Sequence, residues 1–184
     1  MGDTRAFITN ISFPKSLDEV LYFMNVRGIL DMEDLLESSY VEWTAPKTAE
    51  VGDDVFFMHA VTSMDIIKRL QCELNEVKPA ISENDYSILK GALDRATLIY
   101  EKYGAKIFAT GKVCDEIIKD TIAIDDGLHW RSIYYAPIDS IKILDKPVDI
   151  SKFRDFIRVS RTGAITKLES LQVSKLKALI GAYG

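Results

Sequence analysis

The sequence predicts an α+β fold: a small curved β-sheet or partial β-barrel flanked by helices, with a helical insertion. Its 184 residues, 47% hydrophobic and 28% charged, have the size and composition of one ordinary folded domain. Short strand-like segments are scattered among helices, without the regular alternation of a doubly wound βαβ fold. A helical stretch at about residues 62–104 separates the second and third strands, and we interpret it as an insertion within a single domain spanning 1–184.

The first elements are a strand and a helix. Residues 5–13 mix β-branched and aromatic side chains, which is typical of a strand. Ser16 followed by Glu19 forms a capping box and predicts a helix over about 16–25. The polar stretch that follows, which contains Trp43, is expected to be irregular.

The middle of the chain predicts a strand, two helices and another strand. A Gly-Asp turn leads into a buried strand over 55–61. Apolar residues at helical spacing predict two helices within 63–103, separated near Pro79. Residues 105–114 form the next strand, and Gly111 in its interior indicates a bulge or tight bend.

The C-terminal part predicts two consecutive strands, at 129–138 and 141–144. Pro137 must lie at an edge or a bulge, because proline cannot donate to the ladder. A short helix over 150–157 and a closing amphipathic helix over 167–182 complete the chain.

The net charge and the absence of targeting signals argue against some classes of protein. The net charge of −5 argues against indiscriminate coating of polyanions, yet residues 127–184 carry a surplus of basic side chains. A solvated surface explains this surplus as well as phosphate contacts do. No apolar stretch long enough to span a bilayer and no export signal is present, so a cytoplasmic location without membrane contact is expected. Cys72 and Cys114 are expected to be buried, reduced thiols.

Catalytic signals are missing. His59 and His129, the two histidines, have no metal-ligand spacing, and no nucleophile elbow, Walker loop or dinucleotide fingerprint occurs. The adjacent acids at 53–54 and 125–126 are typical of turns. The sequence therefore predicts no catalytic residue, no metal and no cofactor.

The most distinctive segment is residues 129–135, where strand alternation places aromatic and polar side chains on both faces. Aromatic rings stack on bases, and arginine pairs with phosphates or base edges. This combination suits a base pocket. Alternatively, Trp130 and Tyr134 fill the core while His129 and Arg131 pair with surface carboxylates.

Four segments together carry a resemblance to a known family. They are the Gly-Asp turn and strand at 51–59, the glycine-containing strand at 104–113, the His-Trp-Arg segment at 129–131, and the strand at 138–144. In this order they resemble the PUA-like superfamily, particularly its EVE-type members, over most of the chain. The resemblance implies a reader of RNA or of modified DNA bases, which holds a flipped nucleotide in an aromatic pocket without doing chemistry on it.

The resemblance also implies roles for individual residues. The side chains nearest the pocket would be Trp43, Phe57, His59, Trp130, Arg131 and Ser132. Lys112 would lie at the pocket rim, and further phosphate contacts would come from Lys152, Arg154, Arg158 and Arg161.

Three hypotheses about function follow. The first is a non-enzymatic nucleic-acid-binding module, for RNA or DNA, with a base or modified base in the pocket. The second is a protein-interaction or regulatory module whose working surface is the helical stretch at 62–104. The third is a nucleotide-handling enzyme with His59 or His129 as general base, which requires one of them to lie exposed beside the pocket.

Overall fold

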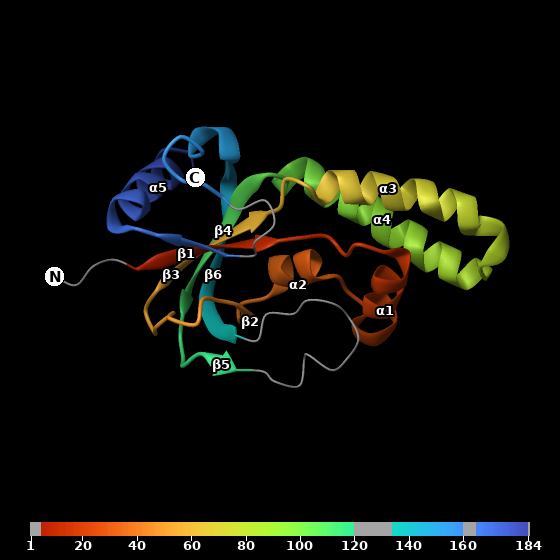
Figure 1. The fold of residues 1–184 in the computed structure, drawn as a ribbon, viewed down its shortest axis with the longest axis horizontal. Coiled ribbons are helices and arrows are strands. Elements are labelled where there is room, and N and C mark those ends of the chain that lie inside the picture. The colour runs from red at the N-terminus through yellow and green to blue at the C-terminus, as the bar shows by residue number, and fades with distance from the viewer. Residues whose placement is uncertain (1–4, 120–133, 160–164, 184) are drawn as a thin grey trace.

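The computed structural model describes residues 5–119, 134–159 and 165–183 (Figure 1). The helices are α1 Leu17–Arg27, α2 Asp31–Glu37, α3 Ser63–Val77, α4 Glu83–Tyr103 and α5 Ser170–Tyr183, with short 3₁₀ turns at Lys78–Ala80 and Ile150–Lys152. The strands are β1 Ala6–Ile11, β2 Val41–Thr44, β3 Asp54–His59, β4 Lys106–Val113, β5 Ile118–Lys119, β6 Tyr134–Asp149 and β7 Ile165–Leu168.

The strands form one mixed sheet in the order β2-β6-β4-β3-β1-β7, with β5 paired to β6. The pairing of β1 with β3 is parallel, and the other pairings are antiparallel. Helices lie around this curved sheet (Figure 1), so the predicted α+β class is confirmed. The parallel pair is possible because the chain crosses from β1 to β3 through α1, α2 and β2.

The long strand β6 bends so that it pairs with β2 at its start and with β4 along the rest. The prediction of two separate strands here was wrong, since Ser140, with φ of 52°, bends the chain without ending the strand. The predicted bulge at Gly111 is confirmed by a register shift between Thr110 and Lys112. A Cβ at Gly111 would lie 2.7 Å from Ile138 Cγ2, so only glycine permits this close approach of β4 and β6.

Two hydrophobic cores lie on the two faces of the sheet, and β3 shows how they divide. Val55 and Phe57 point into one core, which α2 also covers through Met32 and Leu35. Phe56 and Met58 point into the other, which α5 covers. Because successive strand residues face opposite sides, a fully apolar strand such as β3 serves both cores at once.

The two helices predicted within 63–103 are confirmed as α3 and α4, which pack on α1 around a third cluster of apolar side chains. The pair projects away from the sheet (Figure 1). The stretch expected to be irregular instead contains α2 and β2. Residues 150–157 form a 3₁₀ turn followed by turns, not the predicted helix, and β7 precedes a closing helix that begins at Ser170.

The expectation of two buried thiols was also wrong. Cys72 is exposed on α3, and Cys114, just after β4, is half-buried; neither forms a disulfide. Among the helices of the described ranges, none has the length and apolar character needed to cross a membrane.

Gly111→Ala is expected to destabilise the protein by about 1–3 kcal/mol, because the added methyl group must push Ile138 and the carbonyl of Asp139 aside. Gly181→Ala in α5 is the matched control, since nothing lies within 4 Å of a Cβ there and alanine favours the helix. Urea denaturation measures both. Equal midpoints for the two variants would contradict the close approach of β4 and β6.

Candidate functional site

A cavity of about 660 Å³ opens between the end of β1, helices α1 and α2, strand β2 and the start of β6. Its volume lies in the range of small-molecule and cofactor sites, about 300–1,000 Å³. Residues 10–15 line one side, and 40–44 line another. Helices α1 and α2 contribute four of the six charged lining residues described.

Helix α1 is set in place by its two ends. Ser16 Oγ accepts a hydrogen bond from Glu19 N at 3.1 Å, which confirms the predicted cap. The helix ends at Gly28, whose φ of 73° is left-handed and whose N–H donates to the carbonyl of Met24. The chain can therefore turn sharply into α2, so that the two helices form one wall of the cavity.

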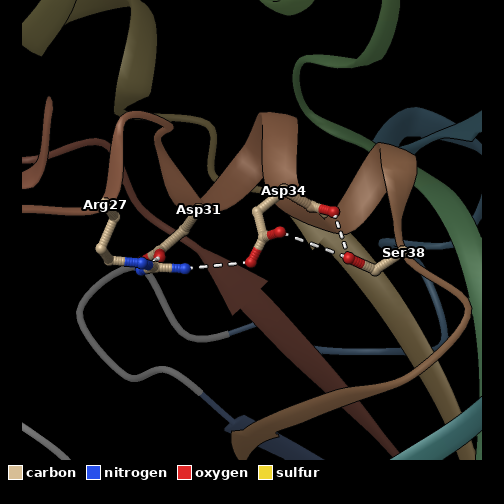
Figure 2. A network of polar contacts seen from close by, with 4 residues as sticks. All are labelled: Arg27, Asp31, Asp34 and Ser38. Atoms are coloured by element: carbon tan, nitrogen blue, oxygen red, sulfur yellow. Dashed lines mark hydrogen bonds and ion pairs between the residues drawn. The ribbon is translucent and has the colours of Figure 1, made fainter.

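The wall formed by α1 and α2 is tied together by Arg27 (Figure 2). Its guanidinium pairs with the carboxylates of Asp31 and Asp34, the latter at 2.9 Å. Ser38 Oγ donates to the carbonyl oxygen of Asp34 at 2.6 Å, and lies 3.3 Å from its carboxylate. The side chains of Asp31 and Asp34 are 47% and 37% exposed, and that of Arg27 is 38% exposed. Solvent therefore screens these ion pairs, which fix the geometry of the wall more than they stabilise the fold.

The aromatic part of the wall comes from β2, β6 and α1. Trp43 is half-buried, and its ring meets Phe57 edge-to-face, with centroids 6.1 Å apart. Tyr135, opposite Thr44 in the β2–β6 pairing, and Phe23 of α1 also line the cavity. Core packing thus holds the indole of Trp43 in one orientation.

A hydrogen bond links β1 to β2 at Thr44, one of the residues that line the cavity. Thr9 Oγ1, fully buried, donates to the carbonyl oxygen of Thr44 at 3.4 Å. Next to it, Asn10 lines the cavity, and its Oδ1 is shielded from solvent with no hydrogen-bond partner among the described residues. An unsatisfied buried acceptor costs about 1–3 kcal/mol, so Asn10 Oδ1 is a candidate partner for a hydrogen-bond donor of a ligand.

The described residues of the lining carry a net negative charge. Among the described lining residues, Lys15 and Arg27 are basic, whereas the acidic side chains are Glu19, Asp31, Asp34 and Glu42. The acids therefore outnumber the bases by two.

The described residues that the sequence placed around a single pocket have different positions in the structure. Trp43 lines the cavity, while Phe57 is fully buried behind it. Trp130, Arg131 and Ser132 lie outside the described residues.

His59 is not among the residues that line this cavity. It is 2% exposed and packs edge-to-face on Tyr100, with ring centroids 5.1 Å apart. Burial lowers the pKa of His59 to about 4, so the imidazole is neutral at neutral pH. A general base must be exposed beside the pocket, and His59 is not. His129 lies outside the described residues.

Those predicted phosphate-binding residues that the structure describes lie on the other face of the sheet. Lys112 pairs with Asp54 at 3.5 Å, as does Lys177 of α5 at 2.7 Å. Lys152, Arg154 and Arg158 are exposed on a segment whose apolar residues join α5 in the second core, whereas α2 covers the first. Arg161 lies outside the described residues. The basic side chains and the cavity are therefore not brought together.

Sequence reasoning missed the charged wall and Tyr135. Arg27, Asp31 and Asp34 were overlooked because the stretch after α1 was interpreted as irregular. A helix signal was present there, namely acidic residues in a first turn followed by Leu35 and Leu36. Within the described parts of the chain, no group of three or more His, Cys, Asp or Glu side chains is placed to hold a metal ion.

The lowered pKa of His59 makes stability depend on pH. As pH falls below the ordinary value of 6.5, the unfolded chain takes up a proton that folded His59 does not bind until about pH 4. Stability present above pH 6.5 is therefore lost between these values, by up to about 3 kcal/mol. His59→Gln should flatten the dependence of the unfolding free energy on pH between 7 and 5. Identical slopes for both proteins in urea titrations would contradict this.

Comparisons with known proteins show likeness in fold only. No protein-family model matches the chain, and no curated protein matches its sequence. The X-ray crystal structure of protein Atu2648 from Agrobacterium tumefaciens is similar, with a TM-score of 0.49 and 11% identity over 97% of this chain and 94% of that chain. Likeness at this level says nothing about a ligand or an activity.

Proposed function

We propose that the chain is a non-enzymatic nucleic-acid-binding module that holds a base in the cavity between β1, β2 and β6. The observation that supports this best is the cavity itself, which has a volume of about 660 Å³ and is lined by Trp43 and Tyr135. Aromatic rings are general stacking platforms for bases. The indole is already positioned by Phe57, so binding requires little ordering of this side chain.

The curved mixed sheet agrees with the resemblance to PUA-like, EVE-type proteins. On this proposal the base is flipped out of its strand and recognised without being altered. Contacts to its exocyclic groups would decide between RNA and DNA and between plain and modified bases.

The exposed basic side chains Lys152, Arg154 and Arg158 supply the phosphate contacts in this proposal. Because their segment packs on the opposite face of the sheet from the cavity, they bind phosphates away from the flipped nucleotide. They contribute affinity that does not depend on sequence, while the cavity contributes selectivity.

A second candidate is a protein-interaction module that uses α3 and α4. The observation that favours it is the projection of this helical pair from the sheet (Figure 1), with Leu98 66% exposed. If neither nucleosides nor oligonucleotides bind, this candidate replaces the first.

Trp43→Ala is expected to weaken nucleoside binding about tenfold or more, since stacking on one aromatic ring is worth about 1–3 kcal/mol per base. Trp43→Phe keeps a ring and should retain most of the affinity. Tyr22→Ala is the matched control, because Tyr22 is 41% exposed on α1 and does not line the cavity. Isothermal titration calorimetry with a panel of plain and methylated nucleosides measures each affinity. An equal loss in Trp43→Ala and Tyr22→Ala would contradict the proposal.

Arg154→Ser combined with Arg158→Ser should reduce the salt dependence of oligonucleotide binding, by about one unit of log–log slope for each phosphate that is no longer bound. The control pair Lys68→Ser and Lys90→Ser removes the same charge from α3 and α4. Fluorescence anisotropy at several salt concentrations gives the slopes. If both pairs change the slope equally, only the overall charge matters and the assigned phosphate-binding residues are wrong.

A further inference from the structure

We infer that the cavity selects a nucleobase that carries positive charge, such as a base methylated on a ring nitrogen. This inference rests on the proposed function, and it specifies which bases the cavity accepts. The observation behind it is the surplus of carboxylates over basic groups among the described lining residues.

Three of the lining carboxylates, those of Asp31, Asp34 and Glu42, are only partly neutralised by the described residues. Asp31 and Asp34 share the single guanidinium of Arg27, which leaves the three side chains together with one negative charge. Glu42, exposed on β2 beside Trp43, accepts a hydrogen bond from the hydroxyl of Tyr40 at 3.3 Å, which does not remove its charge. A ligand with positive charge is therefore stabilised at this wall, and an anionic one is disfavoured.

The aromatic residues indicate that this cation is flat. Trp43 and Tyr135 are among the residues that line the same cavity as the carboxylates. A delocalised ring cation gains from both, through cation–π attraction with the rings and through charge attraction with the acids. A compact, strongly hydrated ammonium group gains less from the rings, because it cannot stack on them.

The location of the basic residues supports the same conclusion. The phosphates of a bound strand would be held by residues such as Arg154 and Arg158, which belong to the other face of the sheet. The cavity therefore has no need to accommodate phosphate, and its negative lining acts on the base. Charge at the ring then adds to stacking in choosing one base over another.

The test compares two isomers, 1-methyladenosine and N6-methyladenosine. As neutral molecules they have the same formula, but at pH 7 the first is protonated and carries a positive ring charge, whereas the second is neutral. Calorimetry at pH 7 and low salt should give at least fivefold tighter binding of the cationic isomer, and this preference should shrink as salt rises.

Two variants test whether the lining causes this preference. Glu42→Gln removes one lining charge next to Trp43 and should reduce the preference for the cationic isomer severalfold, with little effect on N6-methyladenosine. Glu37→Gln is the matched control, because Glu37 is exposed on α2 and does not line the cavity. Circular dichroism confirms that both variants are folded.

The outcomes separate this inference from the proposed function. Equal affinity of wild type for the two isomers overturns the charge preference and leaves base binding intact. Failure of every nucleoside and oligonucleotide to bind overturns both. Spermidine that binds in the cavity as tightly as 1-methyladenosine, and competes with it, overturns the requirement for a flat ring.

Discussion

The bend of β6 over β4 is the constraint on which the rest of the molecule depends. It needs the left-handed conformation at Ser140 and the contact between Gly111 and Ile138, which no larger residue would permit. Because of the bend, one strand pairs with β4 along its second half and with β2 at its start. Strand β2 thereby lies close enough to β1 for the hydrogen bond between Thr9 and Thr44, and residues of both strands line the cavity.

The two faces of the sheet have different chemistry as well as different cores. One face carries α2 and the acid-lined cavity, and the other carries α5 and the exposed basic segment around Arg154. The modest net charge of −5 hides this division. In our proposal the basic segment attracts a polyanion, and the cavity on the other face discriminates between its bases.

Much of the fold could be predicted from local patterns. The cap at Ser16, the apolar run of β3 and the periodicity of α3 and α4 are decided by nearby residues, and the structure agrees with each of them. The strands β2 and β7 have only four residues each and are stabilised by long-range pairing, which leaves little local pattern to detect. Ser140 could not be recognised as a bend within one strand, because tertiary pairing, not residue type, imposes its conformation.

The site was less predictable than the fold. The resemblance to PUA-like proteins suggested Trp43 as a pocket residue, and Trp43 lines the cavity. The same resemblance grouped Phe57 and His59 with it, but strand geometry directs them into packed surroundings. The charged wall depends on how two consecutive helices turn at Gly28, and such a turn is decided in three dimensions.

The residues that line the cavity lie close together in the sequence. Apart from Tyr135, every described residue that lines it belongs to the continuous stretch 10–44. Most of the site therefore belongs to one connection between two neighbouring strands, β1 and β3, and the sheet supplies little more than its frame. Such an arrangement lets ligand preference change through substitutions in one short segment, while β3, β4 and most of β6 keep the fold unchanged.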